Sequence, residues 1–104
     1  MNSDKPKVGC IGAGVLGSAI MRRLIECGFT PNVWNRDHAK LTTLVSAGAV
    51  EAASPAELTR SSMFVITCVS DGVALEKIVF GEHGVAAAGA PDKILIDKIG
   101  RAHV

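Results

Sequence analysis

The sequence lacks the features that mark several classes of protein. No apolar run in its 104 residues reaches the roughly 18 residues that a membrane-spanning helix needs. The first residues, Met1–Lys7, are polar and contain no apolar stretch of the kind found in a secretory signal. The formal net charge is only +1, which provides no general basic field for nucleic acid or an anionic lipid surface. We therefore expect neither nucleic acid nor a membrane as a partner.

Cysteine and histidine are too few and too scattered to suggest a disulfide framework or a metal site. The three cysteines have no Cys-x-x-Cys spacing, and we expect them to be core thiols in a reducing compartment rather than redox or metal-binding groups: Cys10, Cys27 and Cys68. The three histidines lie far apart, without ligand spacing: His38, His83 and His103. We expect a cytoplasmic protein without a metal, and a mitochondrial location stays open for the whole protein.

What the sequence does contain is typical of one folded globular domain, or part of one. Hydrophobic residues make up 48% of the chain and charged residues 20%. We find no internal repeat and no low-complexity segment. Short apolar runs alternate with helical patterns of about 8–14 residues, which is typical of right-handed strand-helix-strand units in a parallel sheet.

A glycine turn, Gly12-Ala13-Gly14-Val15-Leu16-Gly17, organises the chain. It follows the apolar run 7–11 and opens a helix expected over 15–27. Gly12 allows a tight turn, Gly14 leaves room for a pyrophosphate, and Gly17 lets the helix approach the strand. The first amides and the positive end of the helix dipole then face the phosphates. This context predicts dinucleotide binding, and the alternative is a turn kept only for close packing.

The remaining elements follow from periodicity and from helix start and stop signals. Asp37 and Ser54 are expected to cap helices, and Ser70 or Asp71 a later one. In the first helix we expect an apolar face made of Leu16, Ile20, Leu24 and Cys27. Strands are expected over residues 7–11, 32–35, 49–51, 63–69 and 93–97, and the later helices over 38–46, from 55 and over 73–80. The predicted fold is α/β, a Rossmann-type doubly wound parallel sheet with strand order 3-2-1-4-5, incomplete at its C-terminal end.

The residues after the second expected strand indicate which dinucleotide binds. An NAD site usually has an acidic residue there to hold the ribose 2′-hydroxyl, but this chain has Asn35 and Arg36, with Lys40 one turn later. Asn35 can bond a ribose oxygen, and a guanidinium can grip a 2′-phosphate through two charge-assisted hydrogen bonds. Asp37 could serve as the ribose acid in a shifted register, although a helix cap suits it better. We therefore expect NADP, with NAD the less favoured cofactor.

Taken together, these motifs resemble the β-hydroxyacid dehydrogenase family, which includes 3-hydroxyisobutyrate dehydrogenase, 6-phosphogluconate dehydrogenase and the imine reductases. The resemblance runs from about Lys7 to Asp97. It rests on several segments in addition to the glycine turn: Val33-Trp34-Asn35-Arg36 with Lys40, Gly48-Ala49, Ala53-Ser54-Pro55-Ala56-Glu57, Cys68-Val69-Ser70-Asp71 with Ala74, Phe80-Gly81-Glu82-His83-Gly84-Val85 and Ile96-Asp97. It implies reversible hydride transfer between NADP(H) and a small 3-hydroxy acid or aldehyde, or an imine in one branch. It also implies that Val69 and Ser70 lie against a ribose of the cofactor and that the whole protein is a homo-oligomer.

The chain departs from the family pattern after Asp97. The family continues there with hydroxyl residues, then a helix carrying a catalytic Lys and an α-helical domain, whereas this chain continues with residues 98–104. We expect residues 1–97 to be a partial NADP-binding domain and 98–104 a non-homologous tail, of the kind that sequencing-adapter read-through produces. No catalytic residue can be assigned, because Lys93 and Lys98 match no family position. The alternatives are a non-catalytic nucleotide-binding or interaction module, or an enzyme like pyrroline-5-carboxylate reductase.

Overall fold

The computed structural model describes residues 5–68, 72–89 and 94–97, and its central feature is a parallel sheet of five strands. The strands are β1 (Val8–Ile11), β2 (Asn32–Trp34), β3 (Val50–Glu51), β4 (Phe64–Thr67) and β5 (Ile94–Asp97). Their order is β3-β2-β1-β4-β5, and every pairing is parallel. The predicted doubly wound fold and strand order are therefore confirmed. Strands β1 to β4 are slightly shorter than the expected ranges, and residue 93, where β5 was expected to begin, lies outside the described residues.

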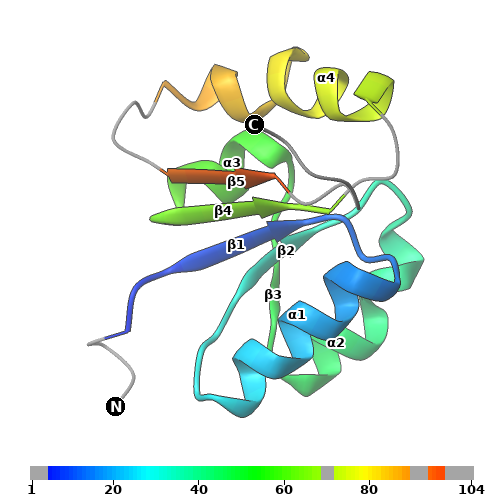
Figure 1. Cartoon of the computed structure of the whole chain (residues 1–104), viewed down its shortest axis with the longest axis vertical. Coiled ribbons are helices and arrows are strands. Elements are labelled where there is room, and N and C mark those ends of the chain that lie inside the picture. The colour runs from blue at the N-terminus through cyan, green and yellow to red at the C-terminus, as the bar shows by residue number, and fades with distance from the viewer. Residues whose placement is uncertain (1–4, 69–71, 90–93, 98–104) are drawn as a thin grey trace.

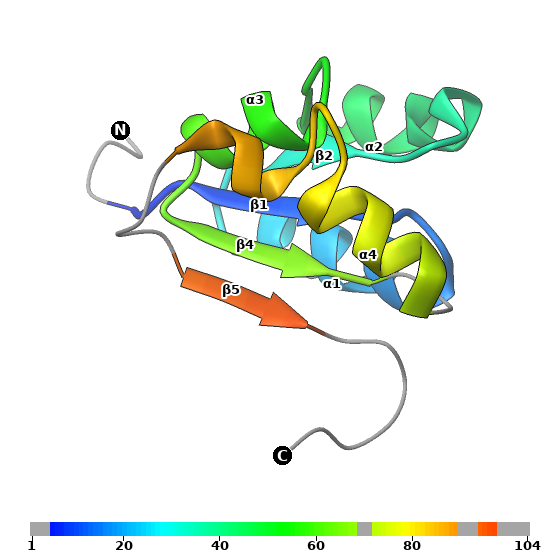
Figure 2. The same ribbon diagram turned by 90° about the horizontal axis from the view of Figure 1, so that it is seen from above.

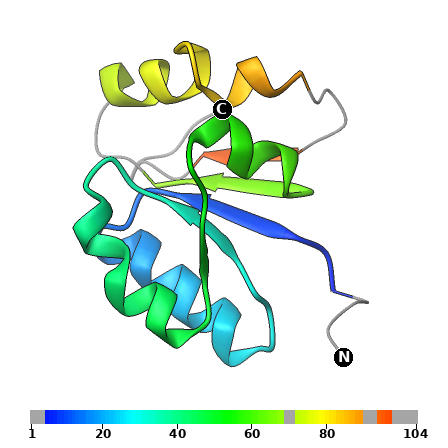
Figure 3. The same ribbon diagram turned by 180° about the vertical axis from the view of Figure 1, so that it is seen from behind.

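Helices cover both faces of the sheet (Figures 1 and 2). One face carries α1 (Val15–Glu26) and α2 (Thr42–Ala47), which follows the 3₁₀ turn η1 (His38–Leu41). The other carries α3 (Pro55–Arg60), α4 (Gly72–Phe80) and the 3₁₀ turn η2 (Val85–Ala88), as the view from behind also shows (Figure 3). In the part of the chain that the structure describes, no helix is long and apolar enough to cross a membrane.

Two hydrophobic clusters, one on each face, join the helices to the sheet. Under α1 and α2 the buried residues are Cys10, Ala13, Met21, Val33, Leu41, Leu44 and Ala49. On the opposite face they are Ile11, Leu58 and Val65, with Trp34, Ala52, Ile78 and Val85 packed against them. Neighbouring residues of β1 and β2 alternate between the clusters, because side chains point to opposite faces of a sheet. This packing fixes the helices relative to the carboxyl ends of β1 and β2.

The buried face of α1 differs from the expected one. Gly17 and Met21 are its buried residues, whereas Leu16 is 48% exposed and Cys27 is exposed. The face is rotated by one residue because Gly17 must lie against the strand, and Met21 follows it at i+4. The predicted face was therefore wrong at Leu16 and Cys27, whereas Ile20 and Leu24 are half-buried. The expectation that Cys27 is a core thiol was also wrong.

The predicted helix signals are mostly confirmed. The carboxylate of Asp37 accepts a hydrogen bond from the Ala39 amide at 3.1 Å, and the Ser54 hydroxyl accepts one from the Glu57 amide at 3.1 Å. At the end of α1, Gly28 has φ +91° and its amide bonds the Ile25 carbonyl. The helix expected over 38–46 is divided into η1 and α2, and the expected caps of α4, Ser70 and Asp71, lie outside the described residues.

Candidate functional site

The glycine turn at the carboxyl end of β1 is held against its neighbours by backbone contacts. The Gly12 amide donates to the Trp34 carbonyl at 2.9 Å, and Gly12 has φ +107°, a conformation that side chains other than glycine rarely adopt. A Cβ on Gly12 would meet the Cys68 carbonyl, and a Cβ on Gly17 would meet the Gly12 carbonyl. Both glycines are therefore required by packing, as the sequence predicts.

Gly14 differs from these two glycines because it faces open space. No heavy atom of the described chain lies within 4 Å of the position that its Cβ would take, and its φ of −74° suits any residue. It precedes α1 without a side-chain cap, and Val15 beside it is 94% exposed. The first amides of a helix have no partner within it, so this end of the 12-residue helix presents N–H groups and a positive dipole end to the open space. Such a place suits an anion.

The loop after β2 lies against the glycine turn. The Asn35 amide oxygen accepts a hydrogen bond from the Ala13 amide at 2.8 Å, and its NH₂ group donates to the Asp37 carbonyl at 2.9 Å. Arg36, between these two residues, is exposed, and so is Lys40 in η1. The predicted cofactor-binding residues of the first two loops thus come together in space.

Two adjoining pockets lie at this edge of the sheet. The first, of about 260 Å³, is bordered by the glycine turn and the loop after β2: Ile11, Gly12, Ala13, Gly14, Trp34, Asn35, Arg36, Lys40, Cys68, Ala74 and Ile78. The second, of about 470 Å³, lies between the end of β2 and α4: Trp34, Arg36, Pro55, Ala74, Lys77, Ile78, Gly81, Glu82, His83 and Gly84. Trp34, Arg36, Ala74 and Ile78 border both pockets, and we refer to the two adjoining pockets together as the groove.

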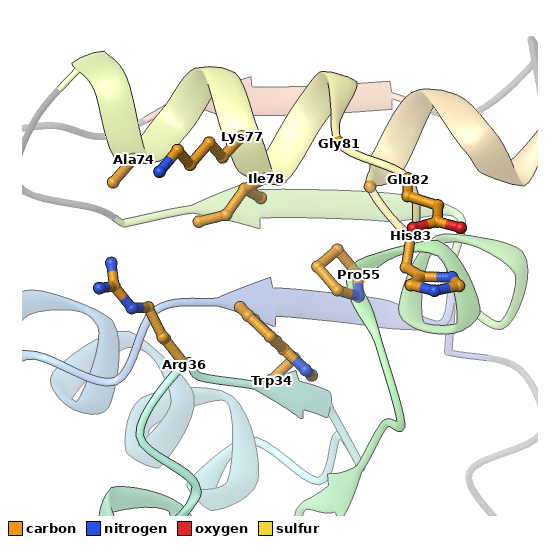
Figure 4. A pocket seen from close by; sticks show the side chains of 10 residues that line it. Trp34, Arg36, Pro55, Ala74, Lys77, Ile78, Gly81, Glu82 and His83 are labelled. Carbon is orange, nitrogen blue, oxygen red and sulfur yellow. The ribbon is translucent and has the colours of Figure 1, made fainter.

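Positive charge borders this groove from two sides. Arg36 projects from the loop after β2, and Lys77 projects from α4 on the opposite wall of the second pocket (Figure 4). Lys40 adds a third cation at the first pocket. Among the described residues, the side-chain ion pairs involve Arg23, His38 and Arg60, so none of the three groove cations is neutralised by one of them. The part of the groove that these cations border therefore suits a ligand with negative charge, whereas Glu82 borders the second pocket beside His83 (Figure 4).

Sequence reasoning missed Trp34 and Lys77 as groove residues. Both stand where the local pattern gives a structural explanation, Trp34 within a strand and Lys77 on a helix surface. A signal for α4 was present, because Ala74, Lys77 and Ile78 follow the i, i+3, i+4 spacing of one helix face. That spacing becomes informative only when the sheet order brings α4 opposite the end of β2.

A buried thiol lies beneath the turn. Cys10 is fully buried, and the thiol of Cys68 together with desolvation raises the pKa of Cys10 far above its usual range. Cys10 is therefore a neutral thiol that serves the core, as expected.

Within the described residues, no group of three or more His, Cys, Asp or Glu side chains could hold a metal ion. Val69 and Ser70, predicted to contact the cofactor, lie outside the described residues.

Comparisons with known proteins agree with this geometry. Residues 7–100 match the family model described as the NAD binding domain of 6-phosphogluconate dehydrogenase. Among curated relatives, human cytokine-like nuclear factor N-PAC is 36% identical over 95 residues, which are 91% of this chain and 17% of that protein. Glyoxylate/succinic semialdehyde reductase 1 from Arabidopsis thaliana is 36% identical over 91 residues, 88% of this chain and 32% of that protein.

Solved structures with nicotinamide cofactors share the fold. An imine reductase from Myxococcus stipitatus in complex with NADP⁺ is 28% identical, with a TM-score of 0.81 over 88% of this chain and 31% of that one. Its V8 variant in complex with NAD⁺ is 26% identical, with a TM-score of 0.82 over 89% and 31%. The chain thus spans between about a sixth and a third of the length of these proteins.

Proposed function

Because the chain belongs to the family of NAD-binding domains of 6-phosphogluconate dehydrogenase, we propose that its groove binds NADP(H) in preference to NAD(H). The observation that carries this proposal is the pair of anion-binding features on one groove. The open N-terminus of α1 at Gly14 would receive the pyrophosphate, and Arg36 with Lys40 would receive the 2′-phosphate. Gly12, Ala13, Val15, Leu16 and Gly17 complete the proposed pyrophosphate loop, and Val69 and Ser70 are proposed ribose contacts.

Preference for NADP follows from charge. The 2′-phosphate is the group that NADP has and NAD lacks, and none of the described residues that border the first pocket is acidic. A guanidinium binds a phosphate through charge-assisted hydrogen bonds, whereas it gains little from a ribose hydroxyl.

For the whole protein, we propose an oxidoreductase that transfers hydride between NADP(H) and a small 3-hydroxy acid or aldehyde. The sequence similarity to glyoxylate/succinic semialdehyde reductase 1 supports this reaction class. Residues 1–97 would form the cofactor-binding part, and we propose that 98–104 lie outside it. We propose that the 104-residue chain binds cofactor without turning over substrate, because no general acid can be assigned in it and proton transfer would be lost. A homo-oligomer is proposed for the whole protein.

A second candidate is a nucleotide-binding module without catalysis. It is favoured by the similarity to N-PAC, whose name describes a nuclear factor rather than an enzyme. The two candidates share the groove and the cofactor, and differ only in whether a catalytic Lys accompanies this domain. Sequencing the complete transcript distinguishes them, since an enzyme requires a downstream helix that carries this Lys.

Titration of the purified chain with NADPH and NADH tests the proposed cofactor. Replacing Arg36→Ala removes the charge-assisted contacts, so NADPH affinity should fall about 10- to 100-fold while NADH affinity changes little. Arg23→Ala is the matched control, because it removes the same charge from an exposed position on α1 that is paired with Glu26. Equal losses for both cofactors in Arg36→Ala would remove the phosphate role of Arg36. A folded wild-type chain that ignored millimolar NADPH would refute the proposal.

A further inference from the structure

The side chain of Asn35 joins two loops that the cofactor would touch. Its amide oxygen accepts from the Ala13 amide at 2.8 Å, and its NH₂ group donates to the Asp37 carbonyl at 2.9 Å. These partners determine which end of the side chain is which, because an N–H group can pair only with the amide oxygen and a carbonyl only with the NH₂ group. The oxygen and the NH₂ group of the Asn35 side chain therefore each make a hydrogen bond to a different loop.

On one side this contact holds the glycine turn. The Gly12 amide already donates to the Trp34 carbonyl at 2.9 Å, so the Ala13 contact makes two consecutive amides of the turn bind to two consecutive residues at the end of β2. The Ala13 amide is then occupied. A pyrophosphate would be bound by the amides that follow it, at the start of α1.

On the other side this contact holds the segment that carries the cations. The Asp37 carbonyl also accepts from the Lys40 amide at 3.2 Å, and the Asp37 carboxylate accepts from the Ala39 amide at 3.1 Å. Asp37 thus anchors η1 together with Lys40. Arg36 lies between Asn35 and Asp37 in the chain, so its backbone is fixed at both neighbours.

We infer that Asn35 is a positioning residue that fixes Arg36 relative to the glycine turn, rather than a ligand of the ribose. This inference rests on the proposed function, because the two loops matter together only when one molecule carries both a pyrophosphate and a 2′-phosphate. The side chain acts through the Ala13 amide and the Asp37 carbonyl. One amide group thereby links the proposed pyrophosphate site to the proposed 2′-phosphate site.

The inference predicts that Asn35 and Arg36 are energetically coupled in NADPH binding. In the wild-type background, Arg36→Ala should weaken NADPH binding about 10- to 100-fold. In an Asn35→Ala background the same change should cost about 3-fold or less, because an unrestrained Arg36 no longer holds the phosphate in place. If Asn35 and Arg36 instead contacted the cofactor independently, the fold-losses in NADPH affinity of the two single variants would multiply in the double variant. That result would overturn the inference.

Asn32 provides a matched control on the same strand. Its NH₂ group donates to the Ser61 carbonyl and to the Ser62 hydroxyl, both at 3.1 Å, at the opposite end of β2. Asn32→Ala therefore removes a comparable pair of hydrogen bonds without touching the two loops. The full effect of Arg36→Ala should persist in that background. If Arg36→Ala also cost less affinity in the Asn32→Ala background, the coupling would come from general destabilisation of the fold. That result would contradict the positioning role of Asn35.

Binding can be followed by the fluorescence of Trp34, the single tryptophan of the chain, which borders both pockets. If Asn35→Ala does not fold, amide hydrogen exchange of the wild-type chain without cofactor replaces the cycle. The Ala13 amide should then be protected and the Gly14 amide fast, and a fast Ala13 amide would overturn the inference. Absence of NADPH binding to the folded wild type would refute the proposed function. If the wild type binds NADPH but the two substitutions weaken binding independently, only the inference about Asn35 is refuted.

Discussion

The glycines of the turn differ in what an added methyl group would meet, and this difference separates folding from binding. A Cβ on Gly17 would collide with the Gly12 carbonyl, whereas a Cβ on Gly14 has no heavy atom of the described chain within 4 Å. The first position is constrained by the packing of α1 on the strand. The second is constrained only by whatever enters the groove.

This difference leads to a prediction for two alanine variants. Gly17→Ala should lower the free energy of unfolding by about 1–3 kcal/mol, because the collision forces α1 away from the strand. Gly14→Ala should leave the melting temperature unchanged or slightly higher, and should weaken NADPH binding at least about tenfold because its methyl group occupies the phosphate space. Thermal melting and NADPH titration of both variants test this. A Gly14→Ala variant with wild-type affinity would show that the pyrophosphate lies elsewhere.

Single residues were predictable from the sequence where their function depends on local chemistry. The positions of Gly12, Gly17 and the caps Asp37 and Ser54 follow from turn and helix chemistry that spans only a few residues. Lys77 could not be found this way, because its presence at the groove depends on α4 lying opposite the end of β2. The two hydrogen bonds of Asn35 were also beyond sequence reasoning, since one partner is 22 residues away.

At the scale of elements, helix α1 illustrates how a close contact overrides simple periodicity. The pattern of large apolar residues predicts a face through Leu16 and Leu24, but the buried positions are Gly17 and Met21. Strand order and helix boundaries were predictable, because alternating apolar runs and stop signals are strong. The rotation of a helix about its own axis was not, since one glycine contact decides it.

Replacing single residues of α1 tests this rotation. Met21→Ala should lower the free energy of unfolding by about 2–4 kcal/mol, because Met21 is fully buried between α1 and the sheet. Leu16→Ala is the control, and it should cost less than about 1 kcal/mol because Leu16 is 48% exposed. Denaturant unfolding of both variants gives the comparison. A larger loss for Leu16→Ala would restore the face expected from the sequence.

At the scale of the whole molecule, the two edges of the described sheet are unequal. At one edge, β3 has only two residues; at the other, β5 has four, and its sequence begins Ile94-Leu95-Ile96. A longer apolar edge strand can pair with another copy of the chain, whereas a two-residue strand offers little backbone for pairing. Association between copies is therefore expected at β5.

We predict that the purified chain associates as its concentration rises, and that Leu95→Lys shifts it toward the monomer. A charge on an edge strand opposes edge-to-edge pairing. Val50→Lys, on the two-residue edge strand β3, is the control and should leave association unchanged. Sedimentation velocity over a range of concentrations measures the effect. If the chain stays monodisperse at high concentration, or if both lysine variants act alike, β5 is not the site of association.

The sheet order has a thermodynamic consequence for the molecule as a whole. The chain builds β1, β2 and β3 first, then continues on the other side of β1 with β4 and β5. One wall of the groove, with Arg36 and Lys40, comes from the earlier half, and the other, with Lys77 and Ile78, from the later half. A molecule seated between them acts as a bridge across the middle of the fold. Occupancy should therefore make the two halves melt as a single cooperative unit, at a temperature that rises with the concentration of that molecule.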